Sequence, residues 1–256
     1  EKAVKEIFSG LFNDAGKEIV IEEFLIGEEV SYFIIADENN FIELTSAQDH
    51  KRIGKGDTGP NTGGMGAYSP APIMNRELKE ITINKIIKPT LKAMKDLGCP
   101  YTGVLYAGLM ITNEGPKLIE YNVRFGDPEC QVILPRLKSD LLSLIISSCK
   151  NSLNQEKILW DDRFALTIVM SSKGYPNDYK TGHEIKGINK VSNQDDIYIY
   201  HAGTKKVNDI IYTNGGRVLN ITSLGKTVGD ANKSALRAIN MIKWNGSYYR
   251  NDIGWR

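Results

Sequence analysis

The segment Leu118–Glu129, "LIEYNVRFGDPE", carries residue types that can bind a metal ion and a phosphate together. Side chains alternate between the two faces of a strand, so Glu120, Asn122 and Arg124 point the same way in a regular strand. A carboxylate and an amide oxygen can coordinate Mg²⁺, and a guanidinium can neutralise charge on a transferred phosphoryl group. Spacing alone favours a simpler interpretation, a solvated strand face, because polar alternation is commonplace.

The residues after this strand favour catalysis instead. Phe125-Gly126-Asp127-Pro128-Glu129 joins turn-forming residues to two further acids. A turn at the end of a strand is a usual place for catalytic side chains in α/β proteins. We therefore interpret this strand and its turn as part of a catalytic site.

The segment Val20–Glu29, "VIEEFLIGEE", is the second candidate. A strand that runs into a short connector can present its backbone N–H and C=O groups to an adenine edge. Glu29, seven residues after Glu22, would then reach ribose hydroxyls. For this segment alone, an acidic strand end on the surface is the simpler interpretation.

The glycine-rich stretch from His50 to Pro70 is the third candidate. Its Gly54-x-Gly56-x-x-Gly59 spacing matches a dinucleotide fingerprint, but that motif needs a helix at its third glycine, and Pro60 follows instead. No Gly-Lys-Ser/Thr closes it as a P-loop. Glycine amides can approach an anion closely, and the preceding charged residues 49–52 carry both signs. We favour a functional loop without a named ligand.

The bulk composition excludes several classes of protein. The 256 residues carry a net charge of +1, which gives no bulk electrostatic footprint for nucleic acid or membrane. A single-stranded nucleic-acid binder using Lys51, Arg52 and Tyr68 is therefore disfavoured. Three cysteines without CxxC spacing indicate reduced, mostly buried thiols of a cytoplasmic protein. The longest apolar run, Leu141–Ile146, is too short to span a membrane.

Periodicity and turn residues predict the elements that position these candidates. Asn75 should cap the long helix and Pro89 should kink it. The expected elements are a helix over 2–12, a strand over 18–27, a hairpin of strands over 28–37 and 40–49, a helix over 75–97, strands over 101–112 and 116–123, and a helix over 137–150.

A second, smaller unit follows a shift in composition over residues 151–163. We expect strands over 165–172 and 197–203, a hairpin around Asn214–Gly216 and a helix over 228–242. This unit shows no nucleophile, metal cluster or charged constellation in its sequence. Its expected role is to pack against the first unit.

Seven segments, in order, resemble the phosphoribosylamine–glycine ligase family of ATP-grasp enzymes: "AQDHKR", "GDTGPNTGGMGAYSPAP", "YTGVLYAGLMI", "RFGDPECQ", "HAGT", "TNGGRVL" and "DIGWR". The resemblance covers essentially the whole chain, and "RFGDPE" followed by x-Q is highly specific. It implies an α+β ATP-grasp fold with a lid remnant over 1–21, a catalytic lobe over 22–155 and a small α+β domain over 156–256. An N-terminal α/β domain would be absent from this chain.

The resemblance also implies residue roles. Glu120 and Asn122 match magnesium or manganese ligands, and Arg124 matches an arginine that contacts the transferring phosphate. The residues that match the adenine hinge and the ribose ligand are Glu22, Glu23, Phe24, Leu25 and Glu29. The residues that match the substrate side are Asp49, Lys51, Arg52, Asn61, Thr62, Gly63, Gly64, Met65, Asp127 and Glu129.

The implied reaction joins glycine to 5-phosphoribosylamine while ATP becomes ADP and phosphate, through a glycyl phosphate. It needs ATP and Mg²⁺ or Mn²⁺, and it proceeds by positioning and charge neutralisation without a covalent nucleophile. The implied partners are these small molecules, without nucleic acid or membrane. The implied protein is a cytoplasmic monomer or weak homodimer.

Two features depart from the pattern of ATP-grasp enzymes. Gly108 lies near the position where many of them carry another metal-binding carboxylate, which leaves the metal count open. The lid's glycine-rich segment and ATP-binding lysine should precede Glu1, so we expect little or no ligase activity from this chain alone. The alternatives are an inactive nucleotide-binding module and another ATP-grasp carboxylate–amine ligase.

Overall fold

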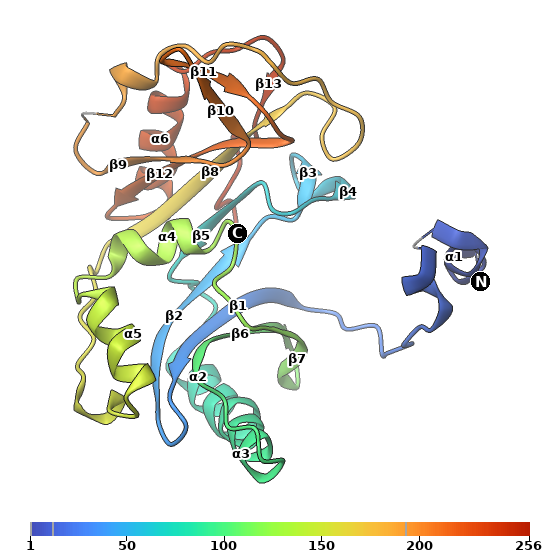
Figure 1. The fold of residues 1–256 in the computed structure, drawn as a ribbon, viewed down its shortest axis with the longest axis vertical. Coiled ribbons are helices and arrows are strands. Elements are labelled where there is room, and N and C mark those ends of the chain that lie inside the picture. The colour runs from blue at the N-terminus through green and yellow to red at the C-terminus, as the bar shows by residue number, and fades with distance from the viewer. Residues whose placement is uncertain (1, 12, 193) are drawn as a thin grey trace.

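One antiparallel sheet runs through the computed structural model, which describes residues 2–11, 13–192 and 194–256. Its strands follow the order β7-β6-β1-β2-β5-β8-β12-β9, and β13 pairs with β8. The two halves of the sheet come from the two halves of the chain (Figure 1). The predicted antiparallel α+β architecture is therefore confirmed.

The first half of the sheet is formed by β1 (Glu28–Ala36), β2 (Phe41–Asp49), β6 (Gly103–Thr112) and β7 (Gly115–Asn122). The predicted hairpin of β1 and β2 is confirmed. In its turn, Asp37 Oδ1 accepts the backbone N–H groups of Asn39 and Asn40 at 2.8 and 2.6 Å. Such Asx contacts explain why the chain reverses there.

The long predicted helix is broken into α2 (Arg76–Thr82), a π-helical turn η3 (Ile83–Ile87) and α3 (Lys88–Asp96). Asn75 caps it as predicted, since its side chain accepts the N–H of Leu78 at 2.9 Å. The π-turn lies just before Pro89, which has no N–H and whose ring opposes the carbonyl four residues earlier. The helix ends at Gly98, whose φ is 76°.

The helix predicted over 137–150 is present in shortened form as α5 (Leu141–Cys149), and a further short helix, α4 (Cys130–Ile133), precedes it. A 3₁₀ turn, η4 (Leu134–Arg136), follows α4. α5 begins later than expected because Asp140 caps it by accepting the N–H groups of Leu142 and Ser143. The α4 helix, directly after the predicted turn, was not predicted.

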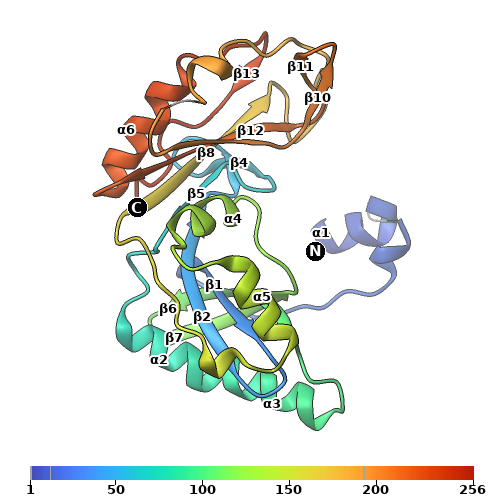
Figure 2. The ribbon, with the colours of Figure 1, turned by 60° about the vertical axis from the view of Figure 1, so that its left-hand side comes forward.

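Helices cover both faces of the first half of the sheet (Figure 2). Along β1, Tyr32 and Ile34 belong to the apolar cluster that contains Ile87 beside α2 and α3. Phe33 belongs to a second cluster, which contains Leu144 of α5. Alternation of side chains along one strand thus supplies two cores.

The second half of the sheet is formed by β8 (Phe164–Ser172), β12 (Arg217–Gly225), β9 (Ile197–His201) and β13 (Ser247–Tyr248). The helix α6 (Val228–Ile239) packs its alanines, Ala231, Ala235 and Ala238, into the core beneath it. Between the halves lies β5 (Gly66–Ser69), which pairs with β2 on one side and β8 on the other. The second unit is therefore part of the same sheet.

The strand predicted over residues 18–27 is wrong. This segment pairs with no described strand and leaves Val20, Ile21 and Phe24 at 86%, 81% and 87% exposed. A strand needs a partner for its backbone groups, and the described part of the chain offers none there. The N-terminal residues form α1 (Lys2–Glu6), η1 (Ile7–Leu11) and η2 (Asn13–Lys17), apart from the main body (Figure 1). Phe12, the end of the predicted helix, lies outside the described residues.

The hairpin predicted around Asn214–Gly216 is also wrong. β11 (Ile210–Thr213) pairs with β10 (Thr204–Val207), whereas β12 pairs with β8 and β9. The turn between β10 and β11 is Asn208-Asp209, with φ of 47° and 64°. Two positive φ values match the twist of paired strands, so this dipeptide forms the two-residue turn.

Two further expectations are corrected. The glycine-rich stretch is not a plain loop, because it contains a small hairpin of β3 (Arg52–Gly54) and β4 (Thr58–Asn61). The prediction of mostly buried thiols is wrong, since Cys99 and Cys149 are exposed and Cys130 is partly buried. The first two lie where helices end at the surface.

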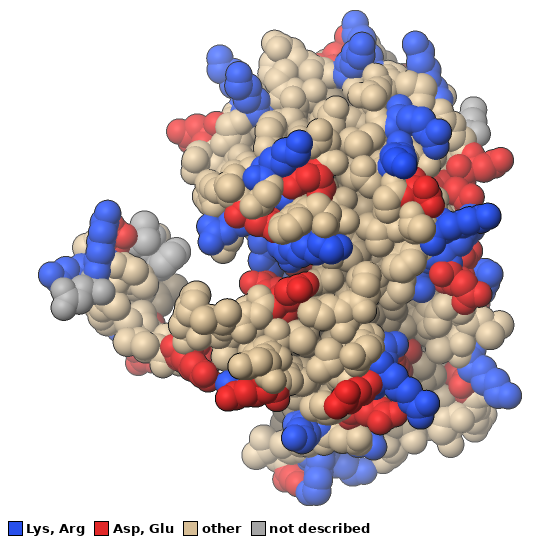
Figure 3. All heavy atoms as spheres, turned by 180° about the vertical axis from the view of Figure 1, so that it is seen from behind, with Lys and Arg blue, Asp and Glu red and all other residues tan. Residues whose placement is uncertain are grey.

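No helix in the described ranges is long and apolar enough to cross a membrane. Lys and Arg side chains are interspersed with Asp and Glu over the face seen from behind (Figure 3). This mixture agrees with the near-neutral net charge.

Arg250 ties the end of the chain to the β3–β4 hairpin. Its fully buried guanidinium donates to Asp57 Oδ1 at 2.8 Å, to Asp252 Oδ2 at 2.7 Å and to the carbonyl of Arg52 at 2.9 Å. Arg250→Met would leave Asp252 without its arginine and Asp57 with Arg256 alone, and breaking a buried ion pair in this way costs about 3–5 kcal/mol. We expect urea denaturation to show a loss of this size.

The matched control is Arg76→Met on exposed α2. Arg76 pairs with Glu80 at 3.0 Å with its own side chain 93% exposed. Such a pair is worth about 0.3–0.5 kcal/mol. Equal losses in the two variants would contradict the structural role of Arg250.

Candidate active site

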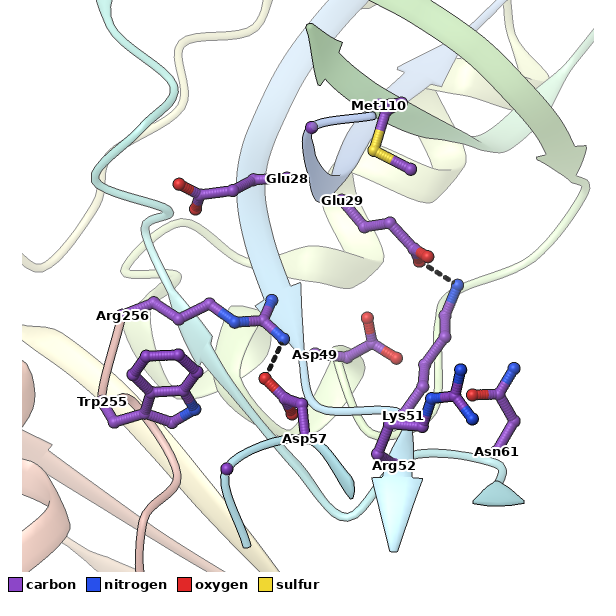
Figure 4. A pocket seen from close by; sticks show the side chains of 12 residues that line it. Glu28, Glu29, Asp49, Lys51, Arg52, Asp57, Asn61, Met110, Trp255 and Arg256 are labelled. Atoms are coloured by element: carbon purple, nitrogen blue, oxygen red, sulfur yellow. Dashed lines mark hydrogen bonds and ion pairs between the residues drawn. The ribbon is translucent and has the colours of Figure 1, made fainter. Parts of the chain in front are cut away.

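Two neighbouring cavities bring together most of the predicted site residues. The large cavity, of about 630 Å³, is lined by Gly27, Glu28, Glu29, Asp49, Lys51, Arg52, Gly56, Asp57, Asn61, Met110, Trp255 and Arg256 (Figure 4). The small cavity, of about 150 Å³, is lined by Asp49, Lys51, Thr62, Gly63, Tyr106, Glu120, Asn122, Arg124, Asp127 and Glu129. Asp49 and Lys51, at the end of β2, line both.

The outer wall of the small cavity is the end of β7, at the edge of the sheet. Asn122 Nδ2 donates to Glu120 Oε1 at 3.1 Å, and Arg124 Nη2 donates to Asn122 Oδ1 at 3.1 Å. The three side chains therefore lie on one face, as alternation predicts. A carboxylate, an amide oxygen and a guanidinium are lined up at the mouth of the cavity.

Gly108 makes room for Glu120. The two residues are directly paired across β6 and β7, and a Cβ at Gly108 would lie 3.2 Å from Glu120 Cγ. A larger side chain would push Glu120 away from this position. The position where many ATP-grasp enzymes carry a carboxylate is therefore a glycine here, and the Glu120 side chain packs over it.

Glu129 is fixed inside the small cavity by hydrogen bonds. It is 3% exposed, and its Oε1 accepts from Ser31 Oγ at 2.9 Å and from Tyr106 OH at 3.0 Å. A Cβ at Gly126 would lie 2.3 Å from Glu129 Oε2, so glycine is required at that turn position. Glu129 is therefore a pre-positioned carboxylate.

Lys51 is surrounded by carboxylates. It forms an ion pair with Glu29 across the cavity (Figure 4). Burial lowers the pKa of Lys51, but Asp49, Glu29 and Glu120 outweigh burial and raise that pKa above its usual value. The Lys51 ammonium therefore stays charged at neutral pH.

Among the carboxylates around Lys51, Asp49 has a strongly raised pKa. Burial and the neighbouring carboxylate of Glu129 raise the pKa of Asp49 to about 7, while Lys51 acts against them. One lysine does not compensate the clustered acids. A bound cation or ammonium group would favour the ionised form of Asp49.

The large cavity is bounded by a basic wall from the C-terminal tail. Arg256 pairs with Asp57 beside Trp255, and Arg52 lies on the other side of the cavity next to Lys51 (Figure 4). Burial raises the pKa of Asp57, but the guanidinium groups of Arg256 and Arg250 hold it well below its usual range. Asp57 is thus ionised and orients these arginines.

His50 is a neutral structural group. Its Nε2 accepts the N–H of Gly254 at 3.0 Å, so the proton lies on Nδ1, which faces Asp57 Oδ1 at 3.2 Å. Burial lowers the pKa of His50 to about 4, although Asp57 acts against this. The sequence groups His50 with charged loop residues, but it contributes no charge at neutral pH.

Some predicted residues lie away from these cavities. Glu23, Phe24 and Leu25 line a separate shallow pocket beside the β6–β7 turn, where Glu23 pairs with Lys117 at 3.3 Å. Glu22 is exposed in the same unpaired segment. Met65 is fully buried in the core with Tyr68 and lines neither cavity, although its backbone N–H donates to the carbonyl of His50 at 2.8 Å.

Other residues lie at the site but were not predicted. They come from the C-terminal half and include Trp255, Arg256, Arg217 and Tyr175. The motifs "TNGGRVL" and "DIGWR" contain three of them, and this is the signal that could have found them. Their sequence neighbourhood contains no acid–base or metal pattern.

Two protein-family models match most of the chain. Residues 1–130 match "Phosphoribosylglycinamide synthetase, ATP-grasp (A) domain", and residues 165–256 match "Phosphoribosylglycinamide synthetase, C domain". The chain belongs to the phosphoribosylglycinamide synthetase family. The resemblance inferred from sequence motifs and the expected ATP-grasp fold are thereby confirmed.

Known members of the phosphoribosylglycinamide synthetase family are similar along the whole chain. A phosphoribosylamine–glycine ligase of Brucella melitensis is 51% identical over 254 residues, covering 99% of this chain and 60% of the relative. The chain thus spans about 60% of the length of that relative. A ligase of the same name from Salmonella typhimurium is 50% identical over 259 residues, with coverage of 100% and 60%.

Solved structures show the same fold. The crystal structure of a phosphoribosylamine–glycine ligase from Thermotoga maritima superposes with a TM-score of 0.84 at 31% identity, covering 99% of this chain and 63% of that one. A biotin carboxylase domain of a thermophilic 2-oxoglutarate carboxylase gives a TM-score of 0.65 at 13% identity, with coverage of 97% and 54%. At 13% identity, the similarity to the biotin carboxylase domain shows a shared fold only.

Asp49→Asn should change how stability depends on pH. The pKa of Asp49 is about 7 in the folded chain against a usual 3.8, so the folded state binds the proton more tightly. Between these values, a rise in pH costs the folded state stability. We expect the unfolding free energy of Asp49→Asn, relative to wild type, to increase from pH 5 to pH 8 in urea denaturation.

Asp209→Asn provides the control, because its side chain is 93% exposed in the β10–β11 turn. Its pH dependence should follow that of the wild type. If the unfolding free energy of Asp49→Asn also changes with pH in parallel with the wild type, the pKa of Asp49 is not raised in the folded protein.

Proposed function

We propose that the protein to which this chain belongs joins glycine to 5-phosphoribosylamine, while ATP becomes ADP and phosphate. The observation that carries the proposal is the small cavity, where Glu120, Asn122 and Arg124 face Lys51 and Glu129. Family membership, and relatives named phosphoribosylamine–glycine ligase, support the choice of substrates. The intermediate would be glycyl phosphate.

The donor set at the end of β7 fits a magnesium ion. Mg²⁺ binds through one or two protein oxygen ligands, together with waters and substrate phosphates. Glu120 and Asn122 supply that number of ligands, and the described residues contain no group of three or more His, Cys, Asp or Glu suited to a metal. When bound, the ion would neutralise charge on the phosphates of ATP. Mn²⁺ would suit the same oxygens.

Arg124 would stabilise the phosphoryl group as it moves to the glycine carboxylate. Its Nη1 donates to the carbonyl of Phe125 at 2.8 Å, and its Nη2 donates to Asn122, so the guanidinium is held beside the metal ligands. A pre-oriented cation contributes most where charge develops in the transition state. The chain thus provides electrostatic positioning.

The carboxylates of Asp49 and Glu129 would bind the amino groups of the two substrates. Asp49 and Glu129 face the small cavity, and a glycine ammonium there would offset their mutual repulsion. Asp127, Thr62, Gly63 and Gly64 would complete this side.

The basic wall of the large cavity would receive the phosphate of phosphoribosylamine. Lys51, Arg52 and Arg256 line this space together with Asn61. Arginine suits phosphate because its planar fork can donate two hydrogen bonds. A phosphate held by Arg52 and Arg256 in the large cavity would orient the substrate with its amine toward the carboxylates of the small cavity.

The nucleotide would enter from the side of β1. Glu29 would bind the ribose, and Glu22, Glu23, Phe24 and Leu25 would contact the adenine, largely through backbone groups. In this proposal residues 1–21 belong to the lid, 22–155 to the catalytic lobe and 156–256 to the C-terminal domain. We further propose a cytoplasmic monomer or weak homodimer.

The test is an assay of the full-length protein for ADP release. We expect release to require both glycine and phosphoribosylamine. Glu120→Ala should lower metal-dependent turnover by about 10²–10³-fold, the cost of removing one group that stabilises transition-state charge. Glu80→Ala, on the exposed helix α2 away from both cavities, is the matched control and should keep turnover near wild type.

ADP release that ignores both substrates would refute the ligase assignment. Nucleotide binding without turnover would favour the alternative, a nucleotide-binding protein with this fold. Unchanged turnover in Glu120→Ala, with the fold intact by circular dichroism, would remove Glu120 from the metal site.

A further inference from the structure

Arg217, the first residue of β12, reaches out of the C-terminal half to both loops of the small cavity. Its Nη1 donates to the carbonyl of Gly63 at 2.6 Å and to the carbonyl of Asp127 at 2.9 Å. Its Nη2 donates to Asp127 Oδ2 at 3.0 Å. One guanidinium thus joins two segments that are more than sixty residues apart in sequence.

The peptide unit of Gly63 is held on both sides by the C-terminal half. Its carbonyl accepts from Arg217, and its N–H donates to Tyr175 OH at 3.0 Å. A Cβ at Gly63 would lie 3.0 Å from the Arg217 guanidinium carbon, so glycine permits this close contact. Gly216 in turn allows Tyr175 to approach, because a Cβ there would lie 2.3 Å from the tyrosine ring.

The carboxylate of Asp127 is oriented in the same way. Oδ2 accepts from Arg217, and Oδ1 accepts from Gln131 Nε2 at 2.8 Å. The Arg217 side chain is 21% exposed and the Asp127 side chain is 51% exposed, so this ion pair is shielded from water on the arginine side only. Both oxygens of the carboxylate therefore have assigned donors.

We propose that Arg217 is a positioning residue that sets the shape of the substrate side of the small cavity. It acts through Gly63 and Asp127 and does not reach the metal ligands on β7. The proposal rests on the proposed ligase function for its substrates. Loss of Arg217 should therefore impair use of glycine and phosphoribosylamine and spare the binding of ATP.

A simple structural tie between the two halves is the competing explanation. It predicts a loss of stability without a selective effect on substrates. Arg217→Lys discriminates, because a lysine keeps the charge but cannot make the same planar set of three bonds. Tyr175→Phe removes only the acceptor for the Gly63 N–H and should give a smaller change of the same kind.

The experiment uses steady-state kinetics of the full-length protein with Arg217→Ala, Arg217→Lys and Tyr175→Phe. For Arg217→Ala we expect the KM for glycine to rise at least tenfold, while the dissociation constant of an ATP analogue changes less than twofold. Millimolar guanidinium chloride should restore part of the activity of Arg217→Ala. The control is Arg163→Ala, which removes an arginine paired with Asp161 and Asp196 away from both cavities.

Two results would overturn the proposal. One is an Arg217→Ala protein with a lowered melting temperature but an unchanged KM for glycine. The other is an equal loss of glycine and ATP affinity that guanidinium does not rescue. Either result would assign Arg217 to stability alone.

Hydrogen exchange keeps the proposal testable if the ligase function itself fails. Arg217→Ala should speed amide exchange in residues 61–66 and 125–129 without changing exchange in β1. Unchanged exchange in these two loops would refute the positioning role whatever the protein's activity. Absence of substrate-dependent turnover in the wild type would refute only the proposed function.

Discussion

The backbone pairing of the four-residue strand β5 is the constraint on which the site depends. β5 pairs with β2 at Gln48↔Tyr68 and Asp49↔Ala67, and with β8 from Gly66↔Ile168 to Ser69↔Ala165. This double ladder fixes Asp49 and Lys51 relative to the C-terminal half. Gly66 permits the ladder, because a Cβ there would lie 2.6 Å from the Thr167 carbonyl oxygen.

The two cavities on this frame differ in how their acidic residues are compensated by cations. In the small cavity, burial and then the neighbouring carboxylate of Glu129 raise the pKa of Asp49. Around the large cavity, Asp57 is surrounded by arginines and stays ionised, while burial keeps His50 neutral. Residues adjacent in sequence, Asp49 and His50, thus act in different electrostatic environments. The arrangement places an acid-rich surface beside one where acids are paired with arginines.

Sequence patterns correctly predicted the elements that are determined by residues close together in the chain. The β1–β2 hairpin follows from Asp37 and its neighbours, and the same-face arrangement of Glu120, Asn122 and Arg124 follows from alternation. The strand expected over 18–27 failed because a strand also needs a partner, which single-segment patterns do not reveal. The Asn208-Asp209 turn was overlooked because glycines nearby offered a stronger turn signal. The tertiary contacts of Arg217 and Arg256 follow from no local periodicity or charge pattern, and only the family motifs that contain these residues indicate a role.

The contacts that Arg217 and Arg250 make across the sheet limit where two related chains can be joined into a chimaera. A crossover between two relatives at the composition shift near residue 155 would keep most of each half's core, although Met65 and Tyr68 belong to the C-terminal cluster and Ala165 and Leu224 to the N-terminal one. It would nevertheless pair the guanidinium groups of one parent with the Gly63, Asp127 and Asp57 contacts of the other. Chimaeras of this family should therefore exchange the glycine-rich hairpin together with the C-terminal half, as one inherited block that is discontinuous in the gene.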